Sequence, residues 1–180
     1  MFFNGLDSIT PTFAAAVFHI NNERWRGVPF IIKCGKGLDE RKCDIRIQFK
    51  DVPDNIYDNC PRNELIFRIQ PNEGISFGFL NKKPGFGNDP IISELDLTYK
   101  TRYTSAYIPE AYESLILDAL NGDKSNFVRD DELDVSWEIF TPLLHHIENN
   151  KIKPELYEFG SRGPASLDQF LYKFDFKSKV

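Results

Sequence analysis

The chain has 180 residues, of which 41% are apolar and 14% aromatic, so it has enough material for a folded core and is not intrinsically disordered. A net charge of −5 without a Lys/Arg-rich tail argues against a nucleic-acid partner. The longest apolar runs, such as Phe13–Phe18, are too short to span a bilayer, so no membrane association is expected. An odd number of cysteines with no CxxC pair indicates reduced thiols in a cytoplasmic protein: Cys34, Cys43 and Cys60.

The first half of the chain predicts β-strands. Strands are expected at Thr12–Asn21, Phe30–Lys33, Cys43–Lys50, Glu64–Gln70 and Ser93–Tyr99. In the last three of these, apolar and polar residues alternate with period two, which is typical of an antiparallel sheet with one polar face. Gly74–Asn88 is expected to contain a strand followed by a Gly/Pro-rich loop.

The period changes to that of a helix after residue 108. One helix is predicted through Tyr112 and Leu120, ending near Gly122, and a second begins at a cap formed by Asp130 or Asp131, with a kink at Pro142. A last helix is predicted with Pro164 at its first position. Residues 1–180 are therefore expected to form a single domain of the α+β class, mainly an antiparallel sheet with helices toward the C-terminal end.

A basic segment stands out in this acidic chain. Between Lys33 and Lys50 there are six Lys/Arg residues against three Asp/Glu residues. A cluster of cations in a chain with a negative net charge indicates a binding site for an anion, and phosphate is the anion expected there.

Eight motifs in consistent order carry a resemblance to a known family. They are Arg26-Gly27-Val28-Pro29-Phe30, Cys34-Gly35-Lys36, Glu40-Arg41-Lys42, Arg62-Asn63-Glu64-Leu65, Arg68-Ile69-Gln70-Pro71-Asn72-Glu73, Ser93-Glu94-Leu95-Asp96-Leu97-Thr98-Tyr99, Phe140-Thr141-Pro142-Leu143-Leu144 and Gly160-Ser161-Arg162-Gly163-Pro164. Together they span nearly the whole chain, and the sequence resembles the C-terminal domain of glucose-6-phosphate 1-dehydrogenase.

The resemblance implies an oxidoreductase function. The family oxidises glucose 6-phosphate to 6-phosphogluconolactone with reduction of NADP, the entry step of the oxidative pentose phosphate pathway, and pairs subunits through the sheet of this domain. The N-terminal coenzyme domain and the catalytic histidine of the family lie upstream of the matched region, so no catalytic residue is assigned here and the chain alone is expected to be inactive. The alternative is a non-catalytic phosphate- or NADP-binding or assembly module derived from this domain.

The resemblance also implies substrate contacts. The family's glucose 6-phosphate contacts fall on Lys36, Arg41 and Gln70. Glycines on both sides of Lys36 give this part of the chain the freedom to bring cationic side chains to a phosphate. The alternative is that Lys36 and Arg41 are solvated loop charges.

A second, structural NADP site of the family matches another set of residues: Lys42, Arg46, Arg68, Asp96, Thr98 and Arg162. Two residues depart from the pattern, since Gly78 stands where members with this site carry a lysine and Ser178 where they carry a tyrosine; the chain also ends before the aromatic tail of such members. The alternative is a cross-strand salt bridge of Arg46 or Arg68 with Asp96. No metal site is predicted, because His145 and His146 are adjacent on a helix and cannot both bind one ion.

Overall fold

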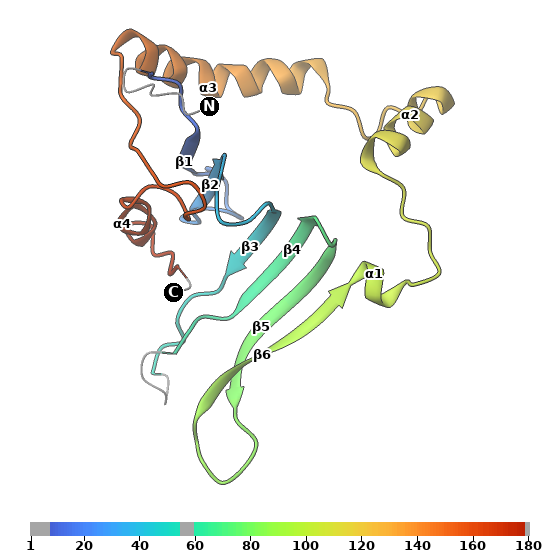
Figure 1. The fold of residues 1–180 in the computed structure, drawn as a ribbon, viewed down its shortest axis with the longest axis vertical. Coiled ribbons are helices and arrows are strands. Elements are labelled where there is room, and N and C mark those ends of the chain that lie inside the picture. The colour runs from blue at the N-terminus through green and yellow to red at the C-terminus, as the bar shows by residue number, and fades with distance from the viewer. Residues whose placement is uncertain (1–7, 55–59, 179–180) are drawn as a thin grey trace. The chain divides into compact units, whose positions relative to one another are not determined.

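The computed structural model describes residues 8–54 and 60–178, in which the chain forms two compact units (Figure 1). The larger unit consists of Thr12–Thr104 and Leu156–Val180 and holds strands β1 to β6; we call it the sheet unit. The smaller unit consists of Ser105–Glu155 with the N-terminal residues up to Pro11, and we call it the helical unit.

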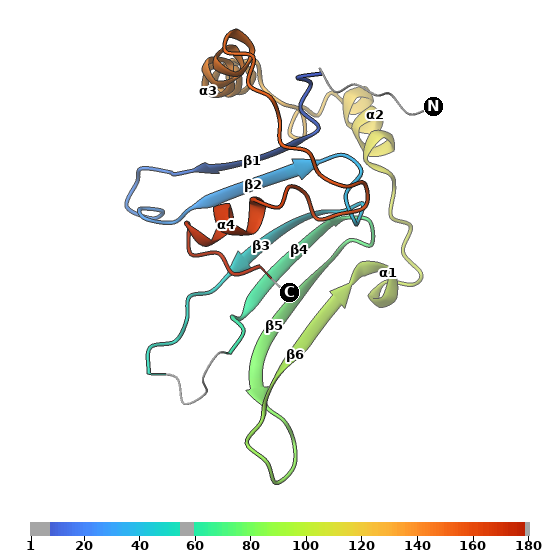
Figure 2. The ribbon, with the colours of Figure 1, turned by 60° about the vertical axis from the view of Figure 1, so that its left-hand side comes forward.

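The sheet unit contains two antiparallel sheets, which confirms the predicted class. β1 (Phe13–Phe18) pairs with β2 (Phe30–Gly35). The second sheet has the order β3-β4-β5-β6 (Figure 2), formed by Cys43–Gln48, Glu64–Gln70, Gly74–Lys82 and Pro90–Thr98. The expected strand and loop of Gly74–Asn88 are also found, because β5 leads into a loop closed by a hydrogen bond from the Lys83 N–H to the Asp89 carbonyl at 2.9 Å.

The four-stranded sheet has one polar and one apolar face, as its register shows. One row of paired residues crosses the polar face from β3 to β6: Arg46, Ile66, Ser76 and Asp96. The neighbouring row crosses the apolar face: Ile45, Phe67, Ile75 and Leu97. The exposure of β3 is the reverse of what its alternation suggests. The polar positions of β3 are half-buried, while the apolar Ile45 and Ile47 on the other face are 56% and 45% exposed. The apolar face is therefore open within the described residues.

Two helices make up most of the helical unit. α2 (Ala111–Asn121) ends at Gly122, whose φ of 74° gives the left-handed cap predicted from the sequence. α3 (Asp130–Asn149) begins one residue earlier than an Asp130 cap predicts, because Arg129 is the capping residue and Asp130, Asp131 and Glu132 form the first turn. Carboxylates in that turn interact favourably with the helix dipole, which accounts for the acidic run without a side-chain cap. The helix contains Pro142 and continues to Asn149.

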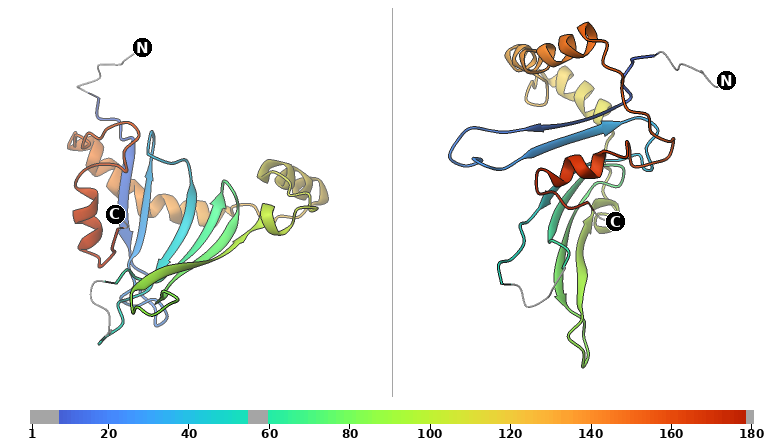
Figure 3. Two further views of the ribbon diagram at one scale, coloured as in Figure 1. Left: turned by 60° about the horizontal axis from the view of Figure 1, so that its bottom comes forward. Right: turned by 90° about the vertical axis from the view of Figure 1, so that its left-hand side faces the viewer.

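The sheet unit has two short helices, α1 (Tyr99–Arg102) and α4 (Leu167–Tyr172). The prediction that Pro164 starts the last helix is wrong, because the Pro164 carbonyl accepts the Leu167 N–H at 3.0 Å in a turn that precedes α4. α4 lies beside the β1–β2 pair (Figures 2 and 3). Its Leu167 and Leu171, one helical turn apart, are each only 5% exposed and are the buried apolar residues of the described part of the chain.

None of the helices described in residues 8–54 and 60–178 has the length and apolar character needed to cross a membrane.

Candidate functional site

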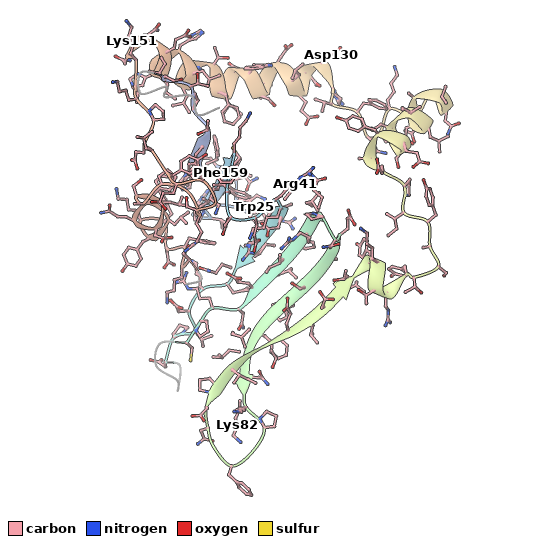
Figure 4. The ribbon with its side chains drawn as sticks, in the orientation of Figure 1. Trp25, Arg41, Lys82, Asp130, Lys151 and Phe159 are labelled. Atoms are coloured by element: carbon pink, nitrogen blue, oxygen red, sulfur yellow. The ribbon has the colours of Figure 1, made fainter. Side chains whose placement is uncertain are left out.

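The predicted substrate residues lie directly after β2, in the loop that leads to β3, and at the end of β4. Lys36 and Arg41 are exposed in the basic loop, which we define as residues 36–42 between β2 and β3. Figure 4 shows Arg41 at the end of the sheet where β3 begins. Gln70 is the last residue of β4 and pairs with Cys43, the first residue of β3, so the register brings Gln70 beside the end of the basic loop.

The structure brings four of the six residues of the predicted second NADP site to one depression on the polar face. Arg46, Arg68, Asp96 and Thr98 line an open cavity of about 420 Å³, together with Ile66, Pro71, Asn72, Gly74, Ile75, Ser76 and Glu94. They come from β3, β4 and β6 and point to the same side, because their positions share a face of the sheet. We call this cavity the polar-face depression.

The two arginines of the depression are held by acids other than the one expected. Asp44 Oδ2 lies 3.3 Å from Arg46 Nη2 and 3.7 Å from Arg68 Nη2, and Glu64 Oε2 lies 3.8 Å from Arg46 Nη1. The alternative of a salt bridge with Asp96 is therefore not found. Asp96 instead accepts the Thr98 hydroxyl at 2.9 Å and the Thr98 N–H at 3.1 Å.

Glu64 is a further residue of this region that was not predicted from the sequence as part of a site. It is only 2% exposed, and its Oε1 accepts a hydrogen bond from Gln48 Nε2 at 3.0 Å. Strand alternation alone predicts that Arg46 and Gln48 lie on the polar face. That Gln48 contacts Glu64 follows only from the register between β3 and β4.

The remaining two residues of the predicted site, Lys42 and Arg162, lie outside the depression but belong to a group of cations around Lys33. The pKa of Lys33 is lowered, first by desolvation of its ammonium group, although the residue as a whole stays exposed, and then by the positive charges of Arg162, Lys42 and Arg46. Asp39 partly opposes this effect. In the sequence, Lys33 belongs to the basic segment, and its positive charge is the only local signal that relates it to a site.

Two cations of this group, Lys42 and Arg162, form ion pairs with nearby carboxylates. Lys42 forms an ion pair with Glu40, and the ammonium group lowers the pKa of that carboxyl. Arg162 Nη2 lies 3.5 Å from Asp168 Oδ1 and also donates to the Ser178 hydroxyl. Because α4 begins only at Leu167, Arg162 does not stand directly before the start of a helix.

The arrangement suits a ligand that carries phosphates and hydroxyl groups. Lys33, Lys42, Arg46 and Arg162 supply positive charge, and guanidinium groups bind phosphate with two parallel hydrogen bonds. The Asp96 carboxylate and the Thr98 hydroxyl supply acceptors for sugar hydroxyls. In residues 8–54 and 60–178, no three His, Cys, Asp or Glu side chains are grouped so as to hold a metal ion.

Comparisons with known proteins agree with one another. Residues 4–177 match the family described as glucose-6-phosphate dehydrogenase, C-terminal domain. A glucose-6-phosphate 1-dehydrogenase of Dictyostelium discoideum is 61% identical over 94% of this chain, and one of Arabidopsis thaliana, described as cytoplasmic, is 55% identical over 93%.

A solved structure is similar in the same way. It is glucose-6-phosphate dehydrogenase in complex with its substrate glucose-6-phosphate, and it superposes with a TM-score of 0.84 at 52% identity over 94% of this chain. The chain spans about a third of these proteins: 35% of the Dictyostelium protein and 35% of the solved chain. By sequence and by fold, the chain belongs to the glucose-6-phosphate dehydrogenase family, of which it represents the C-terminal domain.

Proposed function

We propose that the protein to which this chain belongs is an NADP-dependent glucose-6-phosphate dehydrogenase of the cytoplasm. It would convert D-glucose 6-phosphate and NADP⁺ to 6-phospho-D-glucono-1,5-lactone and NADPH. The observation that carries the proposal is the 52% identity to a dehydrogenase whose structure contains glucose 6-phosphate, together with the exposed basic loop between β2 and β3.

In this proposal the domain binds and orients the sugar phosphate. Lys36 and Arg41 neutralise the phosphate, and Gln70, at the end of β4, donates to or accepts from the sugar hydroxyls. A substrate held in one orientation reacts faster because the entropy of positioning has been lost before the chemical step. NADP, when bound, accepts the hydride from C1 of the sugar. No base for the C1 hydroxyl is assigned to this chain.

The polar-face depression is proposed to bind a second NADP molecule with a structural role. The donor set fits a dinucleotide, since Arg46 and Arg68 in the depression, with Lys42 and Arg162 outside it, offer charge to phosphates. Asp96 and Thr98 offer acceptors to ribose hydroxyls. Binding to the folded state alone would stabilise the protein, by about 2.7 kcal/mol at a ligand concentration one hundred times Kd.

The apolar face of the four-stranded sheet is proposed to form a homodimer interface. Ile45, Ile47 and Leu95 on this face are 56%, 45% and 63% exposed. An apolar surface of this kind is typically covered by a partner, and a second copy covers it symmetrically with the same surface.

The test compares the complete polypeptide with the 180-residue chain. The complete protein should reduce NADP in the presence of glucose 6-phosphate and not of glucose, as followed by NADPH absorbance. The 180-residue chain should show no turnover, since a general base alone contributes on the order of 10²–10⁴-fold. Absence of sugar-phosphate-dependent reduction by the complete protein would show that the proposal is wrong, and turnover by the 180-residue chain would show that the catalytic groups lie within it.

A further inference from the structure

The segment Tyr157–Ser161 runs along the basic loop and is hydrogen-bonded to it, although more than a hundred residues separate the two in sequence. The Gly160 N–H donates to the Gly37 carbonyl at 2.7 Å, and the Asp39 N–H donates to the Ser161 carbonyl at 2.9 Å. Leu38 and Ser161 form a parallel bridge. The segment therefore serves as a strand-like support for the loop that carries Lys36 and Arg41.

The hydroxyl of Tyr157 reaches the backbone of Lys36 itself. It lies 2.6 Å from the Lys36 carbonyl oxygen, 3.0 Å from the Thr12 carbonyl oxygen and 3.2 Å from Thr12 Oγ1. A phenol donates a single hydrogen atom, and the shortest of these distances assigns it to Lys36. The Thr12 carbonyl already accepts the Lys36 N–H at 2.9 Å, and Thr12 Oγ1 is placed to donate to the phenol oxygen. Thr12 and Tyr157 thus hold the backbone of Lys36 at both its N–H and its carbonyl.

The aromatic ring of Tyr157 is held independently of its hydroxyl. It packs edge-on against Phe13, with 5.7 Å between ring centroids and an angle of 63° between the planes. Removal of the hydroxyl should therefore leave the ring in place and release the Lys36 carbonyl and the Thr12 hydroxyl.

The loop needs such a support because of the residue that follows Lys36. Gly37 has a φ of 62°, and glycine allows many other conformations at equal cost. A Cβ at this position would lie 2.8 Å from the Phe159 ring, and the positive φ is strained for other residues, so glycine is favoured here (Figure 4 labels Phe159). The hydrogen bond from Tyr157 selects one orientation of the peptide that joins Lys36 to Gly37.

We propose that Tyr157 is a positioning residue for the substrate phosphate, acting through Lys36 without touching the substrate. This inference rests on the proposed role of Lys36 in binding glucose 6-phosphate. Tyr157 holds the Lys36 backbone in the orientation from which the ammonium group reaches the phosphate.

The test is Tyr157→Phe in the complete enzyme, with Tyr172→Phe as the control at a tyrosine that is 78% exposed. The KM for glucose 6-phosphate should rise about three- to tenfold, as expected for loss of one hydrogen bond, while kcat and the KM for NADP stay within about twofold. A tyrosine that serves folding alone would lower the melting temperature and leave the ratio of the two KM values unchanged.

Hydrogen exchange of the peptide that covers residues 33–42 gives a second readout that does not depend on turnover. Exchange should be several-fold faster in Tyr157→Phe and unchanged in Tyr172→Phe, since the loop amides open more often without the support. Unchanged exchange, or an unchanged KM for glucose 6-phosphate while Lys36→Ala raises it, would overturn the inference. If Lys36→Ala also left this KM unchanged, the proposed substrate site itself would be wrong, and the two failures are thereby distinguished.

Discussion

Asp44 on β3 lies directly opposite Arg68 on β4, with 3.7 Å between the carboxylate Oδ2 and the guanidinium Nη2. The same oxygen lies 3.3 Å from Arg46 Nη2, so one carboxylate holds two arginines on the polar face. A shared counter-ion keeps two like charges close together in the absence of a ligand, and a phosphate that binds there adds a second negative partner for both.

The first prediction concerns the basic loop. Lys36→Ala or Arg41→Ala in the complete enzyme should lower kcat/KM for glucose 6-phosphate about ten- to a hundredfold, because one charge-assisted contact contributes about 1.5–3 kcal/mol. The affinity for the catalytic NADP should change little. Steady-state kinetics with each substrate varied in turn measures both.

Lys124→Ala and Arg129→Ala are matched controls, since both residues are exposed and lie in the helical unit. Unchanged kinetics in the Lys36 and Arg41 variants would mean that these residues are solvated loop charges.

The second prediction concerns the polar-face depression. Arg46→Ala and Arg68→Ala should reduce the rise in melting temperature that added NADP produces, because each removes a cation from the depression. Without NADP, Arg68→Ala should cost no more than about 1 kcal/mol, since its side chain is partly exposed. Arg46→Ala should cost more, because it also removes the cation that lies 3.8 Å from the buried Glu64 carboxylate. Melting curves at increasing NADP concentration separate the two effects. A full NADP response in both variants would exclude the depression as a nucleotide site.

The third prediction restores a cation at Gly78. A Cβ there would meet Ile92 at 3.7 Å and the Glu64 carbonyl at 3.9 Å, both ordinary contacts, so a side chain fits. Gly78→Lys would place an ammonium group on the polar face between Glu64 and Glu94, which pair with Gly78 from the two neighbouring strands. One added charge-assisted contact should tighten NADP binding about tenfold.

The control for this substitution is Gly87→Lys, which adds the same charge in the loop after β5. Titration calorimetry with NADP measures both variants. Equal tightening in the two would attribute the effect to net charge and not to the depression.

The fourth prediction concerns the apolar sheet face. Ile47→Asp or Leu95→Asp should weaken the dimer at least about a hundredfold, because a carboxylate in an apolar interface is desolvated without a partner. Leu156→Asp, at a position that is 86% exposed, is the control. Sedimentation velocity at several concentrations gives the dimer dissociation constant. A dimer that survives both sheet variants would place the interface elsewhere.

The fifth prediction concerns stability at low pH. Arg62 Nη2 lies 2.7 Å from Asp51 Oδ2, and Lys177 Nζ lies 2.9 Å from it. Hydrogen bonds from these two cations hold the pKa of the Asp51 carboxyl far below its usual range. A depressed carboxyl pKa stabilises the fold above the unfolded-state pKa of about 3.9, and the contribution falls as the pH drops below that value.

Asp51→Asn should therefore lower the melting temperature at pH 7 and have a progressively smaller effect as the pH is lowered from about 4 to 2. Melting curves of both proteins across this range measure the difference. Asp54→Asn is the control at a nearby exposed carboxyl. A difference that stays constant with pH would show that Asp51 acts through packing and not through its charge.

The sequence by itself determined the secondary structure of most of the sheet unit and the faces of its strands. β4 spans Glu64–Gln70 as predicted, and α2 ends at Gly122, because alternation of side chains and the left-handed cap are properties of neighbouring residues. The same local pattern assigned Arg46, Arg68, Asp96 and Thr98 to the polar faces of their own strands.

Only the tertiary structure decided what these residues contact. Asp44 lies beside Arg68 because of the register between β3 and β4, and the Tyr157 hydroxyl reaches the Lys36 carbonyl across 121 positions of sequence. Such contacts leave no periodic signal, since they depend on how distant segments meet. Two further features could not be predicted from local sequence. The start of α4 at Leu167 is determined by the turn that precedes it. The exposure of Ile45 and Ile47 is determined by what packs against that face of the sheet, and not by the residue type.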